Sequence, residues 1–175
     1  MQNLWQHSVA TANCCEAIAI QFKIDSKTAF IAGLLHDIGK VVLVDSITTK
    51  YGGNVGRLSS SPTLLAKAIN PFAPIIGLHV VQKWNLSEEL TFSTLYAQKP
   101  ESLPPDAPNA LAHCVRLASD LADSKGYGIF DPDQIQLEGH PALAFFDITQ
   151  EELAALSESL DEMLDSNIGT FGTIS

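Results

Sequence analysis

The run Gly33-Leu34-Leu35-His36-Asp37-Ile38-Gly39-Lys40 places an imidazole and a carboxylate side by side inside a strongly apolar segment with helical character. Burying a charge is costly unless the group is paired or bound to a metal ion. Neighbouring side chains on a helix point about 100° apart, close enough for both to lean toward one cation, and both are ordinary metal ligands. The pair is therefore either a metal site or a hydrogen-bonded pair that fixes the packing. A His-Asp dipeptide is common, so the residues alone favour packing.

The segment before this motif, residues 3–22, has apolar side chains at helical spacing on two sides. Such a helix belongs inside a bundle, with His7 facing inward as either a core histidine or a ligand. Asp25 or Ser26 is expected to cap one second helix that runs through the motif to Leu43 or Val44. Counted from the turn, His7 lies about 10 Å farther along its helix than the motif histidine does. Spacing alone therefore leaves the two histidines apart.

The motif, with Trp5-Gln6-His7-Ser8 some thirty residues earlier, resembles the HD superfamily of metal-dependent phosphohydrolases. Three later features are similar to the HDOD branch of that superfamily: Gly77, the segment Trp84-Asn85-Leu86-Ser87-Glu88-Glu89-Leu90, and the helix Val115-Arg116-Leu117-Ala118-Ser119-Asp120-Leu121-Ala122. The resemblance covers roughly residues 4–124. It implies an all-α, HD-domain-like helical bundle in which the two histidines of the motifs come together.

The HD pattern implies a histidine, then His-Asp, then a distal aspartate as the ligands of a divalent cation. In this sequence His7, His36 and Asp37 match, but the distal position falls on Ser119, and Asp120 beside it points about 100° away. The extra histidines of the related HD-GYP enzymes are missing from residues 72–76 and 95–98. We therefore expect a vestigial metal site with no catalytic residues and no cofactor, although a divalent metal remains possible. Three further histidines are expected to be surface or packing residues: His79, His113 and His140.

Composition limits the classes of function. The chain has 175 residues, 46% of them hydrophobic, which suffices for one domain with a sizeable core. No apolar stretch reaches the length of a membrane span, and three cysteines form no disulfide framework, so we expect a cytoplasmic protein. A formal net charge of -10 repels phosphate backbones and disfavours nucleic-acid binding.

The rest of the chain provides connections and further helices. The glycines of residues 51–56 are expected to form a connection rather than a phosphate-binding loop, because they do not follow a strand in that pattern. The proline-rich residues 99–108 are expected to be a surface connection. We divide the chain into an HD-like core at residues 1–124 and a C-terminal helical extension at 125–175, packed on the same domain. The core is expected to lack the helical segment that usually precedes the first motif in HDOD regions.

These observations favour a non-catalytic module of bacterial signal transduction that acts through contacts with other signalling proteins or domains, without nucleic acid or membrane. The rival is a metal-dependent phosphohydrolase that acts on a nucleotide or phosphate ester, with His7, His36 and Asp37 as ligands. A third alternative is a sensor that binds a small molecule inside the bundle. The sequence leaves the signal, the partner and the oligomeric state open.

Overall fold

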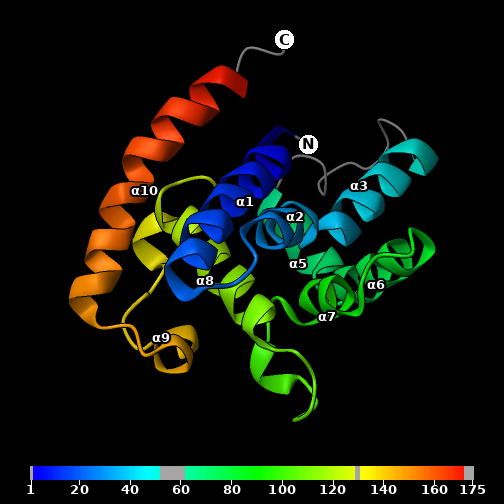
Figure 1. Ribbon diagram of the computed structural model, residues 1–175. Coiled ribbons are helices and arrows are strands. Elements are labelled where there is room, and N and C mark those ends of the chain that lie inside the picture. Colours follow the sequence, from blue (N-terminus) through cyan, green and yellow to red (C-terminus); the bar gives the residue numbers. More distant parts are fainter. Residues whose placement is uncertain (1, 52–61, 129–130, 172–175) are drawn as a thin grey trace.

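The structure, a computed structural model, describes residues 2–51, 62–128 and 131–171, and within these ranges it contains helices and no strand (Figure 1). The all-α prediction is confirmed. The glycine-containing connection expected at residues 51–56 lies outside the described residues from Gly52 on. The helices are α1 (Gln2–Phe22), α2 (Ser26–Leu35), α3 (Ile38–Tyr51), α5 (Pro62–Ile69), α6 (Ala73–Lys83), α7 (Glu88–Tyr96), α8 (Ala110–Ser124), α9 (Pro141–Phe146) and α10 (Gln150–Phe171), with short 3-10 turns at Pro100–Ser102 and Pro132–Gln134.

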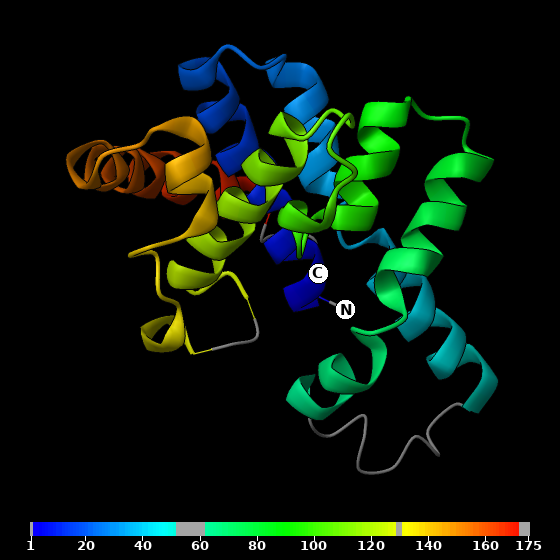
Figure 2. The ribbon, with the colours of Figure 1, turned by 90° about the horizontal axis from the view of Figure 1, so that it is seen from below.

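Helix α1 packs against α2, α8 and α10. Its side chains are buried on more than one side, as its two apolar stripes predict; Cys14, Cys15 and Ile18 are all fully buried. Figure 2 shows α3, α5, α6 and α7 gathered on one side of α1, with α8, α9 and α10 on the other. The main hydrophobic core is built from α1, α8, α9 and α10, and it also includes residues of α2 and Leu90 of α7.

One prediction is wrong: a single helix was expected to run from Asp25 or Ser26 to Leu43 or Val44. In the structure α2 ends at Leu35 and α3 begins at Ile38. Nδ1 of His36 lies 2.7 Å from the carbonyl oxygen of Gly33. In a continuous helix that carbonyl would accept the N–H of Asp37. The imidazole thus takes the place of a backbone donor, and His36 and Asp37 form the turn between two helices.

The two glycines of the motif permit close helix crossings on either side of this turn. A Cβ at Gly33 would lie 2.7 Å from Cα of Ala12, so the glycine lets α2 approach the backbone of α1. A Cβ at Gly39 would overlap the carbonyl oxygen of Ala73 and lie 2.7 Å from the backbone nitrogen of Gly77. Both contacts position the motif, since they fix α2 on α1 and α3 on α6.

Several helix starts agree with their capping residues. The Asp25 carboxylate accepts the N–H of Thr28, and Thr149 and Glu152 form a reciprocal capping box at the start of α10. Beyond the cap, α10 contributes leucines to the same core as α1 and α8. Within the described ranges, each helix is too short or too polar to cross a bilayer.

Candidate metal site

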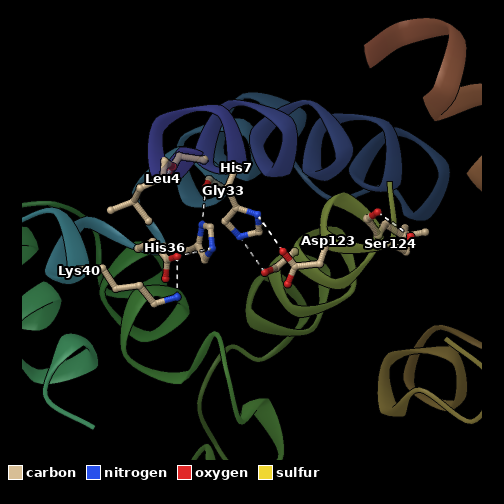
Figure 3. A network of polar contacts seen from close by, with 11 residues as sticks. Leu4, His7, Gly33, His36, Lys40, Asp123 and Ser124 are labelled. Carbon is tan, nitrogen blue, oxygen red and sulfur yellow. Dashed lines mark hydrogen bonds and ion pairs between the residues drawn. The ribbon is translucent and has the colours of Figure 1, made fainter. Parts of the chain in front are cut away.

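All three residues predicted as metal ligands lie together where α1 meets the turn between α2 and α3, and Figure 3 labels His7 and His36 of the three. One donor atom each of His7, His36 and Asp37 lies within 4.8 Å of the others, and all three residues are buried. The two imidazole rings meet edge to face, with centroids 5.2 Å apart. The structure therefore brings together the residues that the resemblance implied.

The helix register explains why the 10 Å offset expected from spacing does not keep the histidines apart. The close approach of Gly33 to Ala12 sets that register. In an antiparallel pair, His36 is then level with Val9, only two residues or about 3 Å from the level of His7. The expected offset of 10 Å is wrong because it was counted outward from the turn, whereas the contact between Gly33 and Ala12 sets which residues of the two helices lie level with each other.

Hydrogen bonds orient the His36 ring. Because the Gly33 carbonyl can only accept, Nδ1 of His36 carries the proton and Nε2 holds a lone pair. This buried Nε2 lies 3.5 Å from Oδ2 of Asp37 and has no hydrogen-bond partner among the described residues. A ring held at Nδ1 by a backbone carbonyl is the usual support of a metal-binding histidine.

Helix α8 faces the other imidazole with two side chains. Oγ of Ser119, the residue that the resemblance puts in place of the distal aspartate, lies 3.3 Å from Nε2 of His7. Oδ1 of Asp123 lies 3.3 Å from Nδ1 of the same ring, but the two are not aligned as a hydrogen bond. Asp120 instead pairs with Arg116 at 2.8 Å and with His140 at 3.0 Å.

Sequence reasoning found no further carboxylate or lysine for the site, and the structure corrects this with Asp123 and Lys40. Asp123 lies four residues after Ser119 and therefore on the same face of α8, a spacing that could have revealed it. Nζ of Lys40 lies 2.7 Å from Oδ2 of Asp37, three residues earlier in the motif. The carboxylate of the motif is thus already paired with an ammonium group of the same chain.

Burial works against the charged form of His7, His36, Asp37 and Asp123. It lowers the pKa of His7 and of His36, and mutual repulsion lowers that of His7 further. Burial works against the ionised form of Asp37, but the attraction of His36 and Lys40 outweighs it and the pKa is lowered. The pKa of Asp123 is raised by burial. The site therefore favours neutral imidazoles and an ionised Asp37.

A cavity of about 620 Å³ opens beside these residues. Its walls come from α1, α3, α5 and α8 and from the segment after α8. Part of the wall is apolar, and the remainder carries the charged and polar groups of the site. The apolar lining residues are Leu4, Val44, Leu65, Ala66, Ile69, Ala97 and Ile135.

The remaining histidines lie elsewhere, as predicted. His79 is exposed, with Nδ1 2.7 Å from the carbonyl oxygen of Ile75. His113 stacks on Phe145 with ring centroids 4.0 Å apart. Nδ1 of His140 accepts the N–H of Ala142 at the start of α9. Among the described residues none of them joins the group of candidate ligands.

The donor set at the site fits a divalent cation. Two imidazoles and one carboxylate match a zinc site with three protein ligands, and the partnerless Nε2 of His36 is a buried lone pair that a cation would satisfy. Ser119 and Lys40 fit less well, because a hydroxyl is a weaker ligand than a carboxylate and the ammonium competes for Asp37. A cation at the site would therefore share the Asp37 carboxylate with Lys40, which contacts Oδ2.

The sequence profile of the HDOD domain matches residues 1–100. The chain belongs to the HDOD domain family. Two crystal structures share its fold. An HDOD domain protein of unknown function from Geobacter sulfurreducens superposes with a TM-score of 0.64 and 20% identity, covering 96% of this chain and 59% of the other. A Shewanella amazonensis protein, provisionally named a phosphohydrolase, superposes with a TM-score of 0.61 and 20% sequence identity. That superposition covers 91% of this chain and 59% of the other.

A ribonuclease Y from Oleidesulfovibrio alaskensis is 31% identical to this HDOD chain over 124 residues. The match covers 71% of this chain but only 19% of the ribonuclease. The chain thus spans about a fifth of that relative.

Proposed function

We propose that this HDOD domain is a non-catalytic regulatory module of bacterial signal transduction that acts in the cytoplasm through protein contacts. The observation that carries the proposal is the ion pair between Lys40 and Asp37, 2.7 Å apart and largely buried. A carboxylate neutralised by its own chain needs no cation for folding. The pair gives the buried polar groups a structural role that does not depend on catalysis.

The serine facing His7 supports the same proposal. A metal-dependent hydrolase needs enough ligands to hold its cation and to orient water. The Ser119 hydroxyl adds a weak ligand in place of a carboxylate, and Asp123 faces the opposite nitrogen of the His7 ring. With a hydroxyl in place of one carboxylate ligand, the polar groups of the site are better suited to holding the helices together than to catalysis.

Metal analysis and activity assays test the proposal. Protein purified without a metal-binding tag is analysed for zinc, manganese and iron, then screened for phosphodiesterase and phosphomonoesterase turnover with each metal added. We expect less than stoichiometric metal and no turnover. Ser119→Asp supplies the missing carboxylate and should raise the affinity for metal. Stoichiometric metal in the unmodified protein, with turnover abolished by Asp37→Ala, would overturn the proposal.

The protein contacts need a separate test. Signalling proteins of the source cell should be captured by the unmodified domain and identified by mass spectrometry. The contact should then be reproduced with both purified proteins, by the unmodified domain and by Asp37→Asn, because a partner surface does not require an active metal site. If the unmodified domain bound none of the purified partner proteins, the result would contradict the proposed role.

The rival function is a metal-dependent phosphohydrolase, and two observations favour it. Nε2 of His36 lacks a hydrogen-bond partner, and a hydrogen bond to a carbonyl orients its ring as in metal sites. The likeness to ribonuclease Y points to phosphodiester chemistry. A divalent cation held by His7, His36 and Asp37 would supply Lewis-acid activation of water. The assays above separate this function from the proposed one.

A further inference from the structure

The cavity beside the site contains an unequal number of acids and bases. Among the described residues that line it, two carry permanent positive charges and three carry carboxylates: Lys40, Arg116, Asp37, Asp120 and Asp123. Lys40 pairs with Asp37 at 2.7 Å, and Arg116 pairs with Asp120 at 2.8 Å. Two of the three carboxylates therefore already bind an organic cation, an ammonium and a guanidinium, supplied by the chain itself.

The third carboxylate, that of Asp123, has a different environment. Within the described part of the chain, its ion-pair partner is the His7 imidazole at 3.3 Å, which is not a permanent cation. Gly128 packs directly against this carboxylate, since a Cβ at that position would overlap Oδ1 of Asp123. The cavity therefore has one carboxylate without a permanent positive partner.

One buried imidazole nitrogen adds an acceptor to the lining of the cavity. Nε2 of His36 lacks a hydrogen-bond partner among the described residues, and its ring lines the cavity. The His36 side chain is only 4% exposed, so its lone pair is largely withheld from water. An unsatisfied buried acceptor in a cavity that also contains a carboxylate favours a ligand with hydrogen-bond donors.

Another part of the cavity wall is apolar and would contact the apolar part of a ligand. Leu65, Ala66 and Ile69 of α5 present an apolar surface, joined by Val44 of α3 and Ile135. A volume of about 620 Å³ lies within the range typical of pockets for small organic molecules. The cavity thus suits a molecule with an apolar body and one polar head.

We propose that this cavity binds a small primary amine with an apolar body, its ammonium group on Asp123 and its body against α5. A phosphate or carboxylate head is disfavoured, because both cations of the lining are already paired and the whole chain carries a net charge of -10. This inference rests on the proposed function in one respect, since the amine would be the signal that the regulatory module receives.

Hexyl compounds that differ only in the head group test the inference. Hexylamine, hexanol, hexanoate and hexyl phosphate are titrated separately by calorimetry near neutral pH, with EDTA present to remove metal. We expect hexylamine to bind about tenfold more tightly than hexanol, because a charge-assisted hydrogen bond is stronger than a neutral one. The two anionic compounds should bind more weakly than hexanol.

Matched variants locate the amine. Asp123→Asn should remove the preference for hexylamine over hexanol, whereas Asp106→Asn, the same change at an exposed position outside the cavity, should keep it. Ser119→Asp adds a carboxylate beside His7 and should raise the affinity for hexylamine. Ala66→Phe fills the apolar end and should weaken the binding of hexylamine and hexanol alike.

Three results would overturn the inference: equal affinities for amine and alcohol, tighter binding of hexyl phosphate, or an amine preference that persists in Asp123→Asn. If Asp123→Asn fails to fold, Ser119→Asp decides, because unchanged or weaker amine binding there contradicts the proposed head-group site. The two tests are independent, because the titrations contain EDTA and measure only binding. Metal-dependent turnover in the activity assays would refute the proposed function, but it would not change the relative affinities for the hexyl compounds.

Discussion

Asp37 is a nearly inaccessible carboxylate, 4% exposed, whose charge is balanced by one lysine three residues later. Lys40→Met keeps most of the apolar stem and removes the ammonium. The buried carboxylate then lacks its closest cation, and removing one partner of a buried pair is more harmful than replacing both. We expect the free energy of unfolding to fall by about 2 to 3 kcal/mol, near the lower end for such pairs because Lys40 is partly exposed. Urea denaturation measures the loss.

A second substitution distinguishes charge from packing. In the Lys40→Met background, Asp37→Asn removes the uncompensated charge and should restore more than half of the lost stability. Lys67→Met, an exposed lysine on α5, serves as the control and should change stability by less than about 0.5 kcal/mol. A double variant as unstable as Lys40→Met alone would show that the lysine stem, and not its charge, stabilises the turn.

The two buried imidazoles predict a loss of stability in acid. Burial lowers the pKa of His7 and of His36 below the ordinary value of 6.5, so the unfolded chain binds their protons more readily than the folded one. Their contribution is present above pH 6.5 and is lost as the pH falls toward their folded pKa values. The raised pKa of Asp123 acts in the opposite direction, since its protonation favours the folded state.

Equilibrium unfolding at a series of pH values checks this balance. Because two histidines destabilise the folded state in acid and one carboxyl stabilises it, the free energy of unfolding should fall by roughly 1 kcal/mol from pH 7.5 to pH 5.5. His36→Asn removes one of the titrating rings and should flatten the dependence. A stability that rises over the same interval would show that Asp123 dominates the acid response.

At the scale of elements, the crossing of α3 over α6 depends on the absence of a side chain at Gly39. Alanine has the higher helix propensity by about 1 kcal/mol, which by itself would stabilise α3. Its Cβ would overlap the carbonyl oxygen of Ala73, and overpacking against backbone costs about 3 kcal/mol. The clash should prevail, so Gly39→Ala should lower the free energy of unfolding by about 2 kcal/mol.

Thermal and urea denaturation of Gly39→Ala measure this loss, with Ser46→Ala on an exposed position of α3 as the control. The control changes helix propensity without touching α6 and should be neutral or slightly stabilising. If Gly39→Ala were equally neutral, the close crossing would not constrain the motif.

The elements also show what local sequence can predict and where it fails. The caps at Asp25 and Thr149 were predictable because a cap acts within one turn of backbone. The break after α2 was not, since it depends on the imidazole of His36 replacing a backbone donor at Gly33. Asp123 could be predicted only through Ser119, because the spacing of four residues puts both side chains on the same face of α8. Periodicity describes one helix and carries no information on which helix faces it.

At the scale of the whole molecule, the main core contains the three cysteines that the described residues include. Cys14, Cys15 and Cys114 are fully buried and unpaired. Burial raises the pKa of Cys14 to about 12, and the same cause raises that of Cys15. The thiolate is the reactive form, so both exposure and ionisation must change before these cysteines react.

The reactivity of these thiols should therefore report unfolding of the core. In native buffer, we expect DTNB to label none of the three within the time that denatured protein needs for complete labelling. In rising urea the labelled fraction should follow the loss of helical circular dichroism, because Cys14 and Cys15 on α1 and Cys114 on α8 lie in one core. Cys15→Ser gives a matched count of two reactive thiols in the denatured state. Labelling of one thiol well below the helical transition would show that α1 and α8 separate before the rest of the bundle unfolds.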